Sequence, residues 1–71
     1  MSHTFSGREA IRSLRHAGFT VDHQRGSHVF LHNPGRNLSV IVPDHGDIKK
    51  GMLHAILRRT GLSAEELRRL A

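Results

Sequence analysis

Apolar and polar residues follow one another along the chain with two different periods, and the change of period separates helices from strands. Apolar residues first recur at the three- and four-residue spacing of a helix, at Ala10, Ile11, Leu14 and Ala17. Ser6 and Glu9 precede them at the spacing of a capping box, in which each side chain bonds the other residue's backbone N–H. Gly18 then supplies a stop signal. The pattern predicts a helix over residues 7–17.

Three shorter stretches follow, in which apolar and polar residues alternate as they do in β-strands. The predicted strands are Phe19–His23, His28–His32 and Leu38–Val42. A turn at Arg25-Gly26 separates the first two, the run from Asn33 to Asn37 has strong turn composition, and Pro43 ends the third. Loops this short between strands predict antiparallel hairpins.

The last third of the chain returns to helical spacing. Asp47 is a candidate N-cap for a second helix, and Gly61 follows its end. The predicted apolar face of this helix consists of Ile48, Met52, Leu53, Ile56 and Leu57. Ser63 and Glu66 repeat the capping-box spacing and predict a short terminal helix to about Leu70.

These elements predict an α+β fold in the order α-β-β-β-α, followed by a short C-terminal helix. Two helices can cover one face of a three-stranded antiparallel sheet and leave the other face open. If Val29 and Leu31 face the helices, period two places His28, Phe30 and His32 on the open face. The chain has no repeat, low-complexity tract or internal linker, so we expect one domain over residues 1–71.

Composition points to a polyanionic partner. Eleven Lys and Arg against six Asp and Glu give a net charge of +5, and nine of the eleven cations are arginine. Such a basic domain attracts nucleic acid, although an acidic protein partner would fit the charge equally. A chain of 71 residues without cysteine has neither a disulfide nor a thiolate metal site, and its thin core leaves no room for a deep enclosed pocket.

Targeting signals are missing from the sequence pattern. No apolar stretch approaches the roughly 18 residues of a membrane span. The N-terminus carries no apolar core of a signal peptide. We therefore expect a cytoplasmic protein with no membrane partner.

The tripeptide Gly26-Ser27-His28 is the sharpest local feature. A turn glycine lets the backbone approach a partner closely, and the imidazole of His28 at the strand start can transfer protons near neutral pH. Phe30, on the same face, can stack on a base. A histidine at this position is also compatible with a purely structural role.

Other catalytic arrangements have weaker support. The chain contains no paired-carboxylate signature and no G-x-S-x-G elbow around Ser27. A metal site would need histidines to converge, and the candidates are His23, His28, His32 and His45. His28 and His32 stand four residues apart on one strand, which separates them by about 13 Å. We therefore predict no metal.

Basic residues recur at helical spacing on both long helices. The first stripe is Arg8, Arg12 and Arg15, and the second is Lys50, His54 and Arg58. Each stripe alone is typical of a solvated helix face. Together with the net charge they favour a surface that contacts phosphates.

Several motifs occur in an order and spacing that resemble the HicA toxins of bacterial and archaeal HicAB toxin–antitoxin modules. They are Gly18-Phe19, Gln24-Arg25-Gly26-Ser27-His28, Val42-Pro43-Asp44-His45, Ile48-Lys49-Lys50-Gly51-Met52-Leu53 and Ile56-Leu57-Arg58-Arg59-Thr60-Gly61-Leu62. The resemblance covers about residues 6–66 and implies a double-stranded-RNA-binding-domain-like fold. It also implies metal-independent cleavage of mRNA with His28 as the catalytic histidine, and a HicB-type antitoxin as the protein partner.

On this basis we expect His28 to act as general acid or base, because RNA supplies its own 2′-hydroxyl nucleophile. The expected RNA-binding residues are Arg25, Gly26, Ser27, Lys49 and Lys50. A free form that is monomeric or weakly dimeric is expected. Two alternatives stay open: a non-catalytic RNA-binding module of the same fold, and a domain that only binds an acidic antitoxin-like protein.

Two positions depart from the family's pattern. His23 stands where the family often has arginine, which either weakens a phosphate contact or adds a second titrating group. Met52 stands where family members usually have threonine, which removes a hydroxyl from the second helix. Neither change touches the Gly-Ser-His motif.

Overall fold

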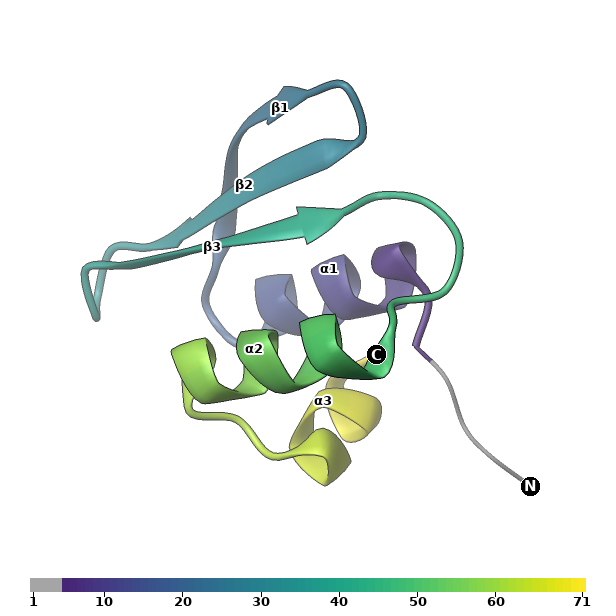
Figure 1. The fold of residues 1–71 in the computed structure, drawn as a ribbon. Helices are drawn as coiled ribbons and strands as arrows, with labels where there is room; N and C mark the ends of the chain where they lie inside the picture. The colour runs from purple at the N-terminus through teal and green to yellow at the C-terminus, as the bar shows by residue number, and fades with distance from the viewer. Residues whose placement is uncertain (1–4) are drawn as a thin grey trace.

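A computed structural model describes residues 5–71 and shows three helices and three strands (Figure 1). The elements are α1 (Gly7–His16), β1 (Thr20–Arg25), β2 (His28–Asn33), β3 (Leu38–Pro43), α2 (Lys50–Thr60) and α3 (Ala64–Leu70). This confirms the predicted α+β class and element order. Residues 1–4 lie outside the described residues. The predicted domain and the segment considered for a signal peptide both begin there.

The strands form one antiparallel sheet in the order β1-β2-β3, with β2 at its centre. Arg25 pairs with His28, so only Gly26 and Ser27 form the loop between β1 and β2. Gly26 has a φ of 57°, which fits the first position of a type II′ hairpin turn. The hairpins predicted from loop length are therefore confirmed.

One face of the sheet packs on the helices and the other is uncovered. Val29 and Leu31 of β2 are buried, as are Val40 and Val42 of β3. Figure 1 shows α1 and α2 beneath this face, with α3 beyond them. His28 on the opposite face is exposed, as the strand period predicts. The arrangement is compatible with a double-stranded-RNA-binding-domain-like fold.

Capping boxes begin two of the helices, as predicted. At α1, the Ser6 hydroxyl accepts from the Glu9 N–H at 3.1 Å and the Glu9 carboxylate accepts from the Ser6 N–H at 3.0 Å. Ser63 and Glu66 make the same pair of bonds at α3, at 3.0 and 2.9 Å. Each box satisfies two backbone donors that a helix start leaves unpaired.

The predicted start of α2 is wrong. Asp47 does not cap the helix but pairs with Ser6 in an isolated antiparallel bridge. The next residue, Ile48, donates its N–H to the Phe5 carbonyl at 2.7 Å and is buried before the helix begins. Pairing with the chain's N-terminal segment therefore overrides the local capping preference, and α2 begins at Lys50. Its end is confirmed by Gly61, the left-handed C-cap.

Two arginines fix the C-terminal end of α2 against the sheet. Arg36, in the loop after β2, donates to the Thr60 carbonyl at 2.6 Å. Arg59 donates from Nε to the carbonyl of Ser39 on β3 at 2.9 Å. These two bonds join the β2–β3 hairpin to the C-terminal end of α2.

Candidate nucleic-acid interface

Cross-strand pairing arranges the open face of the sheet in three rows. The first row is Arg25, His28 and Pro43; the second is His23, Phe30 and Ile41; and the third is Thr20, His32 and Ser39. Directly paired residues on one face of a sheet have Cβ atoms about 4.5–5.5 Å apart. The predicted catalytic His28 therefore lies beside the predicted phosphate contact Arg25.

The Gly-Ser-His turn is hydrogen-bonded to the segment that follows β3, the strand beside β2. The carbonyl of Ser27 accepts a 2.6 Å hydrogen bond from the backbone N–H of Asp44, which follows β3. The Asp44 carboxylate in turn lies 3.9 Å from the Arg8 guanidinium on α1. The turn that carries His28 is thus tied to the loop that leads into α2.

Lys49 lies at the same end of the sheet as His28. It lines a shallow hollow together with Pro43, which is the residue paired with His28, and with Met52. Lys50 follows as the first residue of α2 and is exposed. The five predicted RNA-binding residues therefore fall into two groups, one in the β1–β2 hairpin and one at the start of α2.

The two predicted basic stripes lie apart from the open face. Arg8, Arg12 and Arg15 line a hollow of about 310 Å³ with Gln24 and Val29, on the helix side of the sheet. The α2 stripe, formed by Lys50, His54 and Arg58, is exposed along that helix. Of this stripe, only Lys50 belongs to the group at the start of α2 that also contains Lys49.

His23 reaches the open face because of a β-bulge in β1. Thr20 pairs with His32 and Val21 with Leu31, but the register then shifts, and His23 pairs with Phe30. Without the extra residue, His23 would lie opposite Val29 and face the helices. Bulges often re-aim side chains next to active sites. Strict alternation along the predicted strand would put His23 on the same face as Val21, so the sequence pattern does not reveal this shift.

The ring of His23 stacks on Phe30 with its centroid 4.2 Å away and the planes 13° apart. Its Nδ1 lies 3.2 Å from a carboxylate oxygen of Asp22. Both rings lie on a face open to solvent, beside the first row that contains His28. This stack of two rings stands next to the candidate catalytic histidine.

Of the histidines considered as metal ligands, His32 and His45 lie within the described residues and form no group of ligands with His28. His32 bonds through Nδ1 to the Ser39 hydroxyl at 3.0 Å, and His45 lies on the loop after β3. Across residues 5–71, no three histidine, cysteine, aspartate or glutamate side chains are grouped so that they could hold a metal ion.

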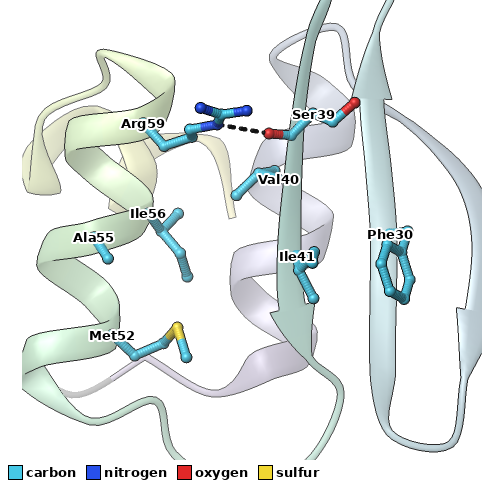
Figure 2. A pocket seen from close by; sticks show the side chains of 8 residues that line it. All are labelled: Phe30, Ser39, Val40, Ile41, Met52, Ala55, Ile56 and Arg59. Atoms are coloured by element: carbon cyan, nitrogen blue, oxygen red, sulfur yellow. Dashed lines mark hydrogen bonds between the residues drawn. The ribbon is translucent and has the colours of Figure 1, made fainter.

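A second surface feature is an apolar groove of about 410 Å³ between β3 and α2. Figure 2 shows Met52, Ala55 and Ile56 of α2 facing Val40 and Ile41 of β3, with Arg59 and Ser39 at one end. Ile41 is 47% exposed and Met52 43% exposed. The sequence pattern predicts Met52 on the apolar face of the helix, and in the structure this part of the face is not covered but lines the groove.

Comparison with known proteins gives one match. A family model described as the HicA toxin of bacterial toxin–antitoxin matches residues 7–62, which is most of the chain. Among curated proteins, no sequence matches closely enough to count as a relative. Within the described residues 5–71, no helix has the length and apolar character needed to cross a membrane.

Proposed function

The chain belongs to the HicA toxin family, the toxin side of a toxin–antitoxin pair, and from this premise we propose that it is a metal-independent endoribonuclease that cleaves mRNA. One observation carries the proposal: His28 is exposed on an uncovered sheet face, in a turn bonded to the segment after β3, with Arg25 paired beside it. This is the arrangement that a general acid or base needs when its substrate is a long polyanion.

The cleavage reaction requires few protein groups. The 2′-hydroxyl of RNA attacks the adjacent phosphate once its proton is removed, so a positioned imidazole and a nearby cation are sufficient. An imidazole contributes about 10²–10⁴-fold as a general acid or base. Arg25 supplies positive charge where the phosphate develops negative charge. The backbone can approach closely at Gly26, where a Cβ would meet no atom within 4 Å.

The start of α2 is suited to a second phosphate. Helix N-termini carry a partial positive charge, so acidic side chains are favoured there and cations are disfavoured. In α2, however, the first turn contains no acidic residue, the N-cap Lys49 makes no side-chain cap, and Lys50 follows. An anion bound at this point would relieve the unfavourable charge, and an RNA phosphate has the required chemistry.

The middle row of the open face is suited to stacking with a nucleobase of the RNA. RNA-binding proteins recognise unpaired bases largely by stacking them on aromatic side chains. Phe30 and His23 already stack on each other, and a nucleobase can extend this stack beside the candidate catalytic histidine. Single-stranded RNA therefore fits the open face better than a closed duplex does.

Cleavage of a defined mRNA by the purified protein tests the proposal. We expect the wild type to cleave in excess chelator and His28→Ala to lose about 10²-fold or more in rate, while it still binds RNA. The matched control is His54→Ala, which removes an exposed histidine from α2 and should cleave normally. Equal rates for wild type and His28→Ala would exclude the mechanism. Loss of activity in chelator, restored by zinc, would exclude metal independence.

The non-catalytic alternative, an RNA-binding module, makes a different prediction in the same assay. It requires RNA binding by both wild type and His28→Ala, with cleavage by neither. A domain that only binds an acidic antitoxin would show neither binding nor cleavage of RNA. Expression in cells gives a second comparison, because only a ribonuclease makes growth arrest depend on His28.

For the protein partner we propose a HicB-type antitoxin that covers the open face and inserts an apolar side chain into the groove between β3 and α2. Ile41 belongs both to the open face and to this groove, so one bound protein can cover the two together. The net charge of +5 favours an acidic partner, and Arg59 provides a cation at the end of the groove. Charge complementarity of this kind speeds and orients association.

Affinity for a co-expressed HicB-type antitoxin tests this contact. Ile41→Asp should weaken binding at least tenfold, or about 1.4 kcal/mol, because it places a carboxylate in an apolar contact with an acidic protein. Val21→Asp is the matched control, since Val21 is 46% exposed but lies on β1 outside the groove. Equal loss in both variants would show that the groove is not the contact.

A further inference from the structure

We propose that His23 is a second catalytic residue, the general acid that protonates the leaving 5′-oxygen while His28 acts as the general base. The inference deepens the proposed ribonuclease function and rests on it. It is carried by the β-bulge, the stacking on Phe30 and the contact with Asp22, three observations that together give His23 a fixed place beside His28.

The bulge determines which face of the sheet His23 occupies. On the register set by Thr20 and His32, Asp22 would lie opposite Phe30, and His23 would point toward the helices. One additional residue in β1 reverses this, so that an imidazole takes the place of a carboxylate in the middle row of the open face. The local irregularity thus brings a second proton-transfer group to the surface that already carries His28.

Two contacts fix the orientation of the His23 ring. The nearly parallel stack on Phe30, with 13° between planes, restricts the plane of the imidazole. The Asp22 carboxylate, 3.2 Å from Nδ1, accepts the proton of that nitrogen. The Nε2 atom is then the nitrogen that can give a proton to a substrate. The side chain is 51% exposed, so a bound RNA can reach it.

The spacing of the two histidines suits one phosphate. His23 and His28 are diagonal neighbours on an antiparallel pair, because His28 lies opposite Arg25 and His23 opposite Phe30. Diagonal neighbours of this kind are about 7–8 Å apart. A phosphate between them can accept hydrogen-bond contacts of roughly 2.6–3.2 Å from each side, which is the reach that proton transfer requires.

The reaction balances with these two groups alone. His28 removes the 2′-hydroxyl proton, and the 2′-oxygen forms a bond to phosphorus. The bond from phosphorus to the 5′-oxygen breaks, and that oxygen takes the proton of His23. The products are a 2′,3′-cyclic phosphate and a 5′-hydroxyl end. No oxidant, reductant or further reactant is needed, and solvent returns both histidines to their starting protonation states.

Few other ionisable groups face this pair. On β1 they are Asp22 and Arg25 and on β2 His32, and His45 and Lys49 line the hollow beside Pro43; the β3 residues of the open face are Ser39, Ile41 and Pro43, which do not ionise. The helices pack on the other side of the sheet. His32 is a poor substitute for His23, because it is engaged by Ser39 and stands about 13 Å from His28 along β2.

The experiment uses the full chain and an RNA whose cleavage site is first mapped with the wild type. His23→Phe preserves the stacked ring but cannot transfer a proton, and His32→Ala controls for the loss of another histidine on the same face. We expect His23→Phe to cleave about 10²–10⁴-fold more slowly and His32→Ala to cleave at nearly the wild-type rate. His23→Arg restores the residue that the family often has and carries a positive charge without a transferable proton, and cleavage by this variant at the wild-type rate would overturn the proposal.

A second substrate separates proton donation from binding. The same RNA with sulfur in place of the bridging 5′-oxygen at the mapped site has a thiolate leaving group, which needs no general acid. His23→Phe should cleave this RNA at a rate within a fewfold of wild type, whereas His28→Ala should remain slow on both RNAs. Equal slowing of His23→Phe on the two substrates would overturn the proposal, since His23 would then only position the RNA.

The pH profile supplies an independent readout. A base and an acid together give a bell-shaped dependence of rate on pH. Removing the acid should abolish the fall in rate on the alkaline side, so that His23→Phe rises with pH to a plateau. Cleavage by His23→Phe at the wild-type rate and with the wild-type profile would refute the role of His23 while leaving His28 catalysis intact. Failure of the wild type itself to cleave would refute both.

Discussion

The hydroxyl of Ser13 on α1 donates a 2.6 Å hydrogen bond to the carbonyl of Leu67 on α3, and both residues have no exposed surface. The two residues lie 54 positions apart, so this bond joins the first helix to the last. It satisfies a carbonyl that packing has removed from water. Beside it, Nδ1 of His16 makes a contact of 2.6 Å with the carbonyl of Leu70, so α3 is attached at two points.

Ser13→Ala should destabilise the fold by about 1–3 kcal/mol, because it leaves the buried Leu67 carbonyl without its partner. Urea unfolding followed by circular dichroism measures this loss. Ser39→Ala is the control: its hydroxyl bonds the His32 ring on the exposed face, where water can replace it. A Ser13→Ala protein as stable as the control would show that the bond between α1 and α3 contributes little.

Stability should depend on pH through Glu66. The backbone N–H and then the side chain of Ser63 hydrogen-bond the Glu66 carboxylate and lower its pKa below the usual 4.5. A carboxyl group with a lowered pKa in the folded state stabilises the protein above its unfolded pKa. This contribution is lost as the pH falls through the lower, folded value.

The melting temperatures of wild type and Glu66→Gln should therefore differ at pH 7 and converge as the pH falls below about 4.5. Glu65→Gln serves as the control for removing a negative charge from the same helical turn. A difference between wild type and Glu66→Gln that stays constant down to pH 2 would show that ionisation of this carboxyl group is not its cause.

Gly7 is required by a close approach between α1 and the end of β3. A Cβ at this position would lie 1.9 Å from the Pro43 carbonyl oxygen, a backbone atom that cannot move away freely. The Gly7 N–H also donates to the Gly46 carbonyl at 3.0 Å. Gly7→Ala should therefore destabilise by about 1–3 kcal/mol, which is typical of overpacking.

Gly51 gives the matched comparison, since a Cβ there meets no atom within 4 Å and the residue lies inside α2. Gly51→Ala should stabilise by about 0.5–1 kcal/mol, the usual difference between these residues in a helix. Thermal unfolding of both variants measures the two effects. The same sign for both would contradict the steric argument.

Local sequence signals were sufficient for most of the fold. Ser6 with Glu9 and Ser63 with Glu66 gave two helix starts, because a capping box involves only residues three positions apart. The start of α2 was beyond such reasoning. Asp47 pairs with Ser6, and a contact across more than 40 positions leaves no mark in the local pattern.

The same distinction applies to the candidate site. The period of β2 alone places His28, Phe30 and His32 on the open face, and the structure agrees. His23 could not be placed by alternation, because one bulged residue inverts the face of everything after it. The groove beside Met52 depends on the angle between α2 and β3, which sequence period does not specify.

Reversing the charge of Lys50 should raise the stability of the fold and weaken RNA binding. Lys50 begins α2, where the helix dipole disfavours a cation, so Lys50→Glu should raise the free energy of unfolding by about 0.3–1 kcal/mol. If RNA phosphate binds there, the same change should weaken RNA binding and lower the salt dependence by about one phosphate contact. The more stable protein would then be the weaker binder.

Arg58→Glu is the matched control, because it makes the same charge change in the last turn of the same helix. A cation is favoured at that end, so this variant should lose stability. Both variants lower the net charge equally, and any difference in RNA affinity therefore reports where the phosphate binds. Filter binding in the His28→Ala background measures affinity without cleavage. Equal weakening by both variants would mean that α2 attracts RNA only through the overall charge of the protein and that its N-terminus holds no particular phosphate.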